Sequence, residues 1–121
     1  MNTPQTGIKR LLFSFIHSYN GFKIAVSTQE SFRLDLILFI GGTILSFLLP
    51  INILTKGILI ASLMLILMME LANTAIETVI DRISQKQHPL SKKAKDIGSF
   101  LVFLSIINAL IIWFCVLFDL F

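Results

Sequence analysis

The chain has 121 residues, of which 55% are hydrophobic and only 14% are charged, and its mean hydropathy is +0.86. This composition is typical of membrane proteins and excludes an ordinary water-soluble domain. The net charge of +3 does not indicate nucleic-acid binding, because no basic stretch is interleaved with aromatic residues.

The N-terminal segment, about residues 6–33, is predicted to be an amphipathic helix in the cytoplasmic interface of the membrane. Apolar residues recur there at helical spacing, with polar residues largely between them. The helix is either a simple anchor or a cover over polar groups of the membrane domain. We expect no cleaved signal peptide, because the first ten residues lack a short apolar core. The apolar positions are Ile8, Leu11, Leu12, Phe15, Ile16, Tyr19 and Phe22.

Two stretches without charge are long enough to cross a bilayer. Residues 36–55 and 97–118 contain 20 and 22 uncharged residues, respectively. A hydrocarbon core of about 30 Å needs roughly 20 helical residues. We therefore expect membrane spans at about 34–50 and 97–118. The single cysteine, Cys115, lies in the latter and has no partner for a disulfide within the chain.

A further span is expected at about 55–81, and it must contain two acids. Only 13 uncharged residues separate Lys56 from Glu70, which is too short to cross. The segment spans if it continues through Glu70 and Glu77 to Asp81. Acidic residues inside a membrane are usually functional.

The basic residues predict the orientation of the chain. Four precede the first span and five lie between the second and third, whereas the first connection has only Lys56. By the positive-inside rule, the N-terminus and the 81–96 loop are cytoplasmic and the C-terminus is outside.

The second span carries a polar stripe on an otherwise apolar helix. Glu70, Asn73, Thr74, Glu77 and Asp81 project within an arc of roughly 100°, which must face protein and so favours a homo-oligomer. Glu77, near the cytoplasmic end of the span, can hold a divalent metal. Glu70, roughly 10 Å deeper in the membrane, can accept a proton from a substrate hydroxyl. Two other interpretations stay open at this point: a polar seam between protomers, and a proton or cation pathway.

Taken alone, the basic residues of the loop DRISQKQHPLSKKAKD are solvated charges that orient the chain in the membrane. Beside a carboxylate metal site, the same loop is a candidate phosphate-binding segment, or phosphate clamp. It contains neither a GxxxxGK[ST] nor a GxGxxG motif.

The segments ELANTAIETVIDRI and HPLSKKAKDIGS closely resemble the small integral-membrane diacylglycerol kinase family of bacteria, which also includes undecaprenol kinases. The resemblance extends over nearly the whole chain. It implies a homotrimer of three-span protomers, each with a surface helix, that phosphorylates a lipid alcohol with ATP and Mg²⁺.

The resemblance also implies roles for individual residues. The catalytic base falls on Glu70, with Asn73 beside it, and a metal ligand falls on Glu77. The implied nucleotide contacts are Arg10, His17, Glu77, Lys86, Gln87, His88, Lys95 and Asp96. The implied lipid contacts are Arg33, Asp35, Glu70, Ser99 and Trp113.

Two positions depart from the family pattern. The second metal-binding glutamate of the family falls on Gln29, and the acid is shifted to Glu30. A neutral amide is a weaker ligand for Mg²⁺ than a carboxylate, so either residue is a candidate ligand. His17 stands where related kinases carry a tyrosine.

The sequence thus predicts a single all-α membrane domain over residues 1–121, located in the bacterial inner membrane. The predicted reaction is the phosphorylation of diacylglycerol to phosphatidic acid. The alternatives are an undecaprenol kinase and a small proton-coupled transporter.

Overall fold

The structure is a computed structural model that describes residues 6–121, and this part of the chain contains α-helices and no strand. The helices are α1 (Gly7–Thr28), α2 (Glu30–Leu48), α3 (Ile53–Ile83) and α4 (Pro89–Leu120). The prediction of an all-α protein is confirmed for the described residues. Residues 1–5 lie outside them, and the expectation about a signal peptide falls partly there.

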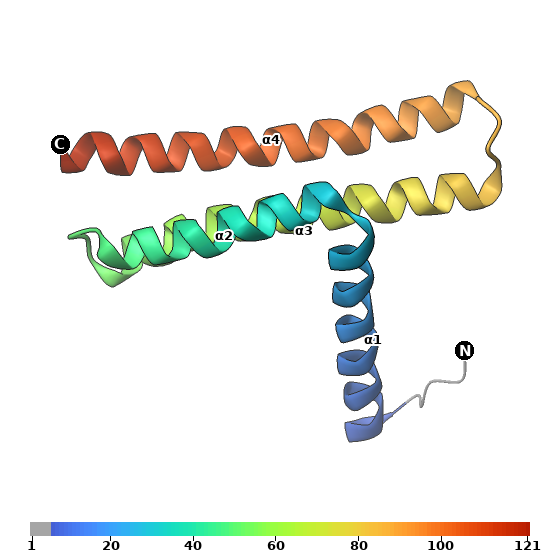
Figure 1. The fold of residues 1–121 in the computed structure, drawn as a ribbon, viewed down its shortest axis with the longest axis horizontal. Coiled ribbons are helices and arrows are strands. Elements are labelled where there is room, and N and C mark those ends of the chain that lie inside the picture. The colour runs from blue at the N-terminus through green and yellow to red at the C-terminus, as the bar shows by residue number, and fades with distance from the viewer. Residues whose placement is uncertain (1–5) are drawn as a thin grey trace.

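The long helices lie along one another as a rod, and α1 leaves this rod crosswise near the start of α2 (Figure 1). α3 is central because it packs against both α2 and α4. α3 and α4 run antiparallel and are joined at one end by residues 84–88 (Figure 1). Among residues 6–121, the end of the rod at this connection is therefore formed by α3, α4 and the loop between them.

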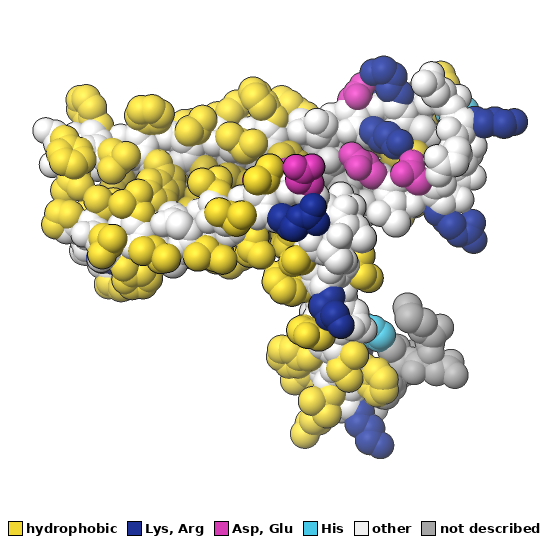
Figure 2. Space-filling model, in the orientation of Figure 1, with side chains coloured by type: hydrophobic (Ala, Val, Ile, Leu, Met, Phe, Trp, Pro, Cys, Tyr) yellow, Lys and Arg dark blue, Asp and Glu magenta, His cyan; other side chains and the backbone are white. Residues whose placement is uncertain are grey.

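The helices α2, α3 and α4 are each long and apolar enough to cross a membrane, which confirms the prediction of three such helices. They correspond to the spans expected at about 34–50, 55–81 and 97–118. Figure 2 shows that charged side chains on this face gather along α1 and toward one end of the rod, while the rest of the rod is hydrophobic or uncharged. This separation suits an integral membrane protein with one polar end.

The expected surface helix and the first span are separated at Gln29, whose extended backbone interrupts the helical path. The Gln29 N–H donates to the Ala25 carbonyl at 2.9 Å, and the Gln29 carbonyl accepts from the Arg33 N–H at 3.2 Å. The Arg33 guanidinium donates to the Val26 carbonyl at 2.8 Å. Carbonyls at the end of α1 are thus satisfied while the chain changes direction.

The opposite turn, between α2 and α3, is closed by two polar side chains. Lys56 donates from Nζ to the Phe47 and Leu49 carbonyls at 2.9 and 3.2 Å. Asn52 caps α3 by accepting from the Thr55 N–H at 2.8 Å. A cation at a helix C-terminus and an Asn at an N-cap are both stabilising. Lys56, in the first turn of α3, therefore stabilises the end of α2.

The three long helices pack through small residues and one aromatic side chain. A Cβ on Gly42 of α2 would overlap the end of the Leu63 side chain, so α2 and α3 approach closely there. Trp113 of α4 packs against the cluster that contains Leu63 and Ala109, and its indole N–H donates to Ser62 Oγ at 3.1 Å.

Candidate active site

Glu70 lies half-buried on α3 beside the start of α2. Ser31 Oγ donates to Glu70 Oε2 at 3.3 Å, and the Asp35 side chain is also a close neighbour of this carboxyl group. Ser31 and Asp35 are four residues apart on α2 and so lie on one face of the helix. The structure thus brings together two of the predicted lipid-site residues, Asp35 and Glu70, and adds Ser31.

Glu77 is half-buried two turns further along α3, roughly 10 Å from Glu70 along the axis. The Asn73 amide nitrogen donates to Glu77 Oε1 at 3.3 Å. Glu77 forms no ion pair with any described residue. A half-buried carboxylate without a positive partner is energetically costly, so this group is well suited to bind a cation.

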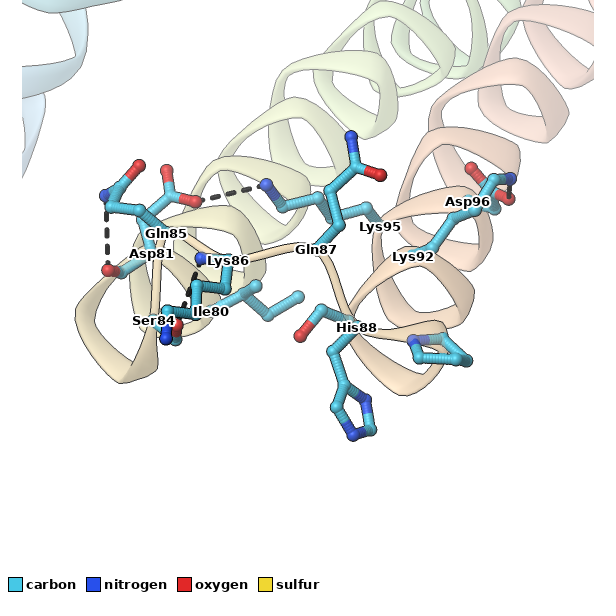
Figure 3. Close-up of a pocket in the computed structure, with 12 residues that line it drawn as sticks. Ile80, Asp81, Ser84, Gln85, Lys86, Gln87, His88, Lys92, Lys95 and Asp96 are labelled. Carbon is cyan, nitrogen blue, oxygen red and sulfur yellow. Dashed lines mark hydrogen bonds and ion pairs between the residues drawn. The ribbon is translucent and has the colours of Figure 1, made fainter.

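A cavity of about 700 Å³ lies at the polar end of the rod, between the end of α3, the connection and the start of α4 (Figure 3). Five predicted nucleotide contacts line it: Lys86, Gln87, His88, Lys95 and Asp96. Their assembly follows from the short connection of residues 84–88, which joins the end of α3 to the start of α4. Its size falls in the range of small-molecule sites.

The cavity is held in shape by contacts between its own side chains. Lys95 pairs with Asp81 at 3.0 Å across α4 and α3, and Lys92 pairs with Asp96 on α4 (Figure 3). His88 caps α4, because its Nδ1 accepts from the Leu90 N–H at 3.1 Å. The Lys86 ammonium forms no ion pair with a described residue, so the cavity presents an uncommitted positive charge.

The remaining predicted nucleotide and metal residues lie elsewhere in this single chain. Arg10 and His17 are exposed on α1 and do not line the cavity. Gln29 donates its side-chain amide to Thr28 Oγ1 at 3.3 Å, and Glu30 is exposed at the first position of α2. Within residues 6–121, no three His, Cys, Asp or Glu side chains gather in a metal-binding group.

Comparison with known proteins identifies the family. Residues 16–117 match the family described as Prokaryotic diacylglycerol kinase. The chain is 35% identical to a diacylglycerol kinase of Escherichia coli over 117 residues, which cover 97% of this chain and 95% of that protein. It is 37% identical to one from Pseudomonas aeruginosa over 113 residues, covering 93% of this chain and 92% of that protein.

A diacylglycerol kinase of Haemophilus influenzae is 36% identical over 113 residues, with 93% and 96% of the two chains covered. The chain belongs to the prokaryotic diacylglycerol kinase family. This confirms the family resemblance and the expectation that the chain is a lipid kinase enzyme.

In this diacylglycerol kinase family member, the other predicted lipid contacts differ in their surroundings. Arg33 is exposed and donates to the end of α1, and Ser99 is exposed on α4. Trp113 is half-buried and lies 14 residues, roughly 20 Å, further along α4 than Ser99. Their roles as lipid contacts stay predictions.

The residues near the candidate site of this kinase that were not predicted as site residues include Ser31, Asp81 and Lys92. Asp81 belongs to the polar stripe and begins the basic loop, and this position could have indicated that it pairs with a lysine of the loop. Lys92 belongs to a run of lysines in which local spacing does not single out one member. Ser31 gave no signal, because its partner Glu70 is 39 residues away along the chain.

Proposed function

We propose that this chain phosphorylates diacylglycerol to phosphatidic acid with MgATP at the cytoplasmic face of the inner membrane. The observation that carries the proposal is the sequence of groups along α3 and its end. Three features follow one another along roughly 16 Å of α3: the basic cavity at Asp81, the Glu77 carboxylate without a positive partner, and the deeper Glu70. A nucleotide in the cavity can direct its terminal phosphate toward the membrane from there.

Glu70 acts as the general base. It accepts the proton of the diacylglycerol hydroxyl while that oxygen bonds to the terminal phosphorus of ATP and the bond to the bridging oxygen breaks, which releases ADP. The hydrogen bond from Ser31 to Oε2 holds the carboxyl group in place beside the Asp35 side chain.

Glu77 fits a magnesium ligand in both chemistry and environment. It is a hard oxygen donor, one of its oxygens is oriented by Asn73, and it lacks a positive partner among residues 6–121. Mg²⁺ is commonly bound by one or two carboxylates together with substrate phosphates and water, and it neutralises the phosphate charge. Glu30 or Gln29 is the second candidate ligand of this chain.

The lysines of the cavity bind the phosphate chain. Lys86 offers an ammonium without an ion-pair partner in the described chain, and Lys95 is held over the cavity by Asp81. Ammonium groups are good point-charge partners for phosphate. Arg33, Asp35, Ser99 and Trp113 are proposed to contact the lipid, with Asp35 nearest to Glu70.

We propose a homotrimer in which Arg10 and His17 of one copy complete the nucleotide site of another. The support is that α1 leaves its own rod crosswise and contributes no residue to the cavity of the same chain (Figure 1). The proposed orientation places the N-terminus and residues 81–96 in the cytoplasm and the C-terminus outside. Its support is the distribution of basic residues along the sequence.

The deciding experiment uses purified protein in mixed micelles with radiolabelled ATP and one of two lipids. We expect labelled phosphatidic acid with diacylglycerol, and little product with undecaprenol. Faster labelling of undecaprenol reassigns the substrate. If neither lipid is phosphorylated, and the protein carries protons across vesicle membranes without consuming ATP, the kinase proposal is contradicted and a transporter is supported.

A further inference from the structure

Gly98 on α4 is buried directly against the side chain of Asn73 on α3. A Cβ built on Gly98 would overlap Asn73 Oδ1 and would lie 3.4 Å from Asn73 Cγ and 3.6 Å from Ile76 Cδ1. The absence of a side chain at this position is therefore what leaves room for the Asn73 amide between the two helices.

The Asn73 amide is fixed from two sides. Its nitrogen donates to Glu77 Oε1 at 3.3 Å, and its oxygen is buried against Gly98 without a hydrogen-bond partner in the described chain. Turning the amide over would direct its oxygen at the Glu77 carboxylate and lose this hydrogen bond. A buried amide oxygen without a hydrogen-bond partner is unfavourable, so the contact with Glu77 must offset it.

We propose that Gly98 is a positioning residue for the metal and nucleotide site. It acts through Asn73, which in turn holds the Glu77 carboxylate in the orientation that receives Mg²⁺ with ATP. The inference rests on the proposed role of Glu77. A methyl group at position 98 displaces Asn73 and releases Glu77, although position 98 itself touches neither nucleotide nor metal.

Other glycines of the chain provide matched comparisons. A Cβ on Gly42 overlaps the flexible end of Leu63, in the packing between α2 and α3, while a Cβ on Gly57 meets nothing within 4 Å. Gly42→Ala thus tests general packing damage, and Gly57→Ala tests the substitution alone. Neither glycine contacts Asn73, Glu77 or a residue of the cavity. A Cβ on Gly42 would lie 3.5 Å from Trp113 Cζ2, a proposed lipid contact, so Gly42→Ala is a control for the Mg²⁺ and nucleotide measurements only.

The test measures two quantities for Gly98→Ala, Gly42→Ala and Gly57→Ala. The first is the affinity for a non-hydrolysable ATP analogue with Mg²⁺, measured by calorimetry in micelles without lipid substrate. The second is the Mg²⁺ concentration at half-maximal kinase activity. Losing a hydrogen bond to a charged group corresponds to a change of about tenfold or more. We expect this change in both quantities for Gly98→Ala alone, with the KM for lipid within about twofold and activity partly restored by excess Mg²⁺.

A double-mutant cycle with Asn73→Ala tests whether Gly98 acts through Asn73. Asn73→Ala removes both the overlap and the donor to Glu77, so we expect Gly98→Ala to add almost no further defect in that background. If Gly98→Ala alone fails to fold, recovery of folding in the double variant supports the same contact. Continued misfolding of the double variant overturns it.

A spectroscopic measurement reports on the contact without metal or nucleotide. In protein labelled with ¹⁵N at asparagine, the side-chain amide signal of Asn73, assigned by its loss in Asn73→Ala, should shift in Gly98→Ala and stay in place in Gly57→Ala. An unshifted signal, unchanged Mg²⁺ dependence, or fully additive defects in the cycle would each overturn the inference. If Glu77→Gln leaves Mg²⁺ dependence unchanged, the proposed function of Glu77 has failed instead.

Discussion

Ser31 at the start of α2 and Glu70 in the middle of α3 are joined by a hydrogen bond of 3.3 Å, although 39 residues separate them in the chain. The contact lies where α2 begins after the break at Gln29. The direction change between α1 and α2 therefore also determines which side chains reach the acid. This relationship links the fold of the N-terminal part to the proposed chemistry.

Replacing the proposed base should reduce turnover strongly. Glu70→Gln keeps the shape and can still accept from Ser31, but its amide cannot take up the hydroxyl proton. We expect kcat to fall by about 10² to 10⁴-fold while the KM for MgATP changes little. Initial rates in mixed micelles measure both constants. Near-normal turnover would show that Glu70 has a structural role only.

Removing the donor to this acid should have a smaller effect. Ser31→Ala deletes a single hydrogen bond of 3.3 Å at an exposed position, so we expect kcat to fall about fivefold or less. Ser31→Thr keeps a hydroxyl group and serves as the control. A loss as large as that of Glu70→Gln would mean that Ser31 contacts the substrate itself.

The charge of Glu77 should control the metal requirement. Glu77→Gln keeps an oxygen near Asn73 but removes the negative charge, so we expect a higher Mg²⁺ requirement and a higher KM for MgATP, each by about tenfold or more. The KM for diacylglycerol should move less. Titrations of Mg²⁺ at fixed ATP provide the measurement, and an unaltered Mg²⁺ curve would assign Glu77 to helix packing.

The sequence was sufficient to predict the helices and the place of the acids, because spans are set by the number of uncharged residues between charges. The loop at residues 81–96 was predicted as a candidate phosphate clamp, but the cavity that its residues line was not predicted, because loop conformation does not follow from local spacing. The break at Gln29 was missed because STQES contains neither proline nor glycine. The Ser31–Glu70 and Asn73–Gly98 contacts depend on the rotation and crossing of helices, which local spacing does not determine.

Lys56 should contribute to stability and leave chemistry unchanged. Its ammonium group binds the Phe47 and Leu49 carbonyls at the end of α2, far from Glu77 along α3. We expect Lys56→Met to lower the free energy of unfolding by about 1–2 kcal/mol, with kcat within about twofold of the parent. Thermal unfolding in micelles tests this, and Lys56→Arg should retain most of the stability. A large loss of kcat in a folded Lys56→Met protein contradicts the assignment.

The shifted acid near the start of α2 can be tested by three variants. Glu30 is exposed at the first position of α2, and Gln29 is half-buried with its amide nitrogen on Thr28. If Glu30 binds Mg²⁺, then Glu30→Ala should raise the Mg²⁺ requirement about tenfold, and Gln29→Ala should have little effect. Gln29→Glu should lower the requirement by adding a charge at the family position. If Glu30→Ala keeps a normal Mg²⁺ requirement and Gln29→Ala is strongly impaired, the Gln29 side-chain amide is the metal ligand.

Mixing two inactive variants tests whether copies of the chain share a site. Arg10 lies on α1, and Glu77 lies on α3, so a site built from two copies recovers both native residues when Arg10→Ala and Glu77→Gln chains assemble together. For random mixing in a closed ring, about a quarter of the sites should be intact, and activity should rise accordingly. The control mixes Lys95→Ala with Glu77→Gln, whose positions belong to α4 and α3 of the same rod, and should recover nothing. If co-assembly is verified and neither mixture gains activity, Arg10 serves the site of its own chain, and the shared nucleotide site is wrong.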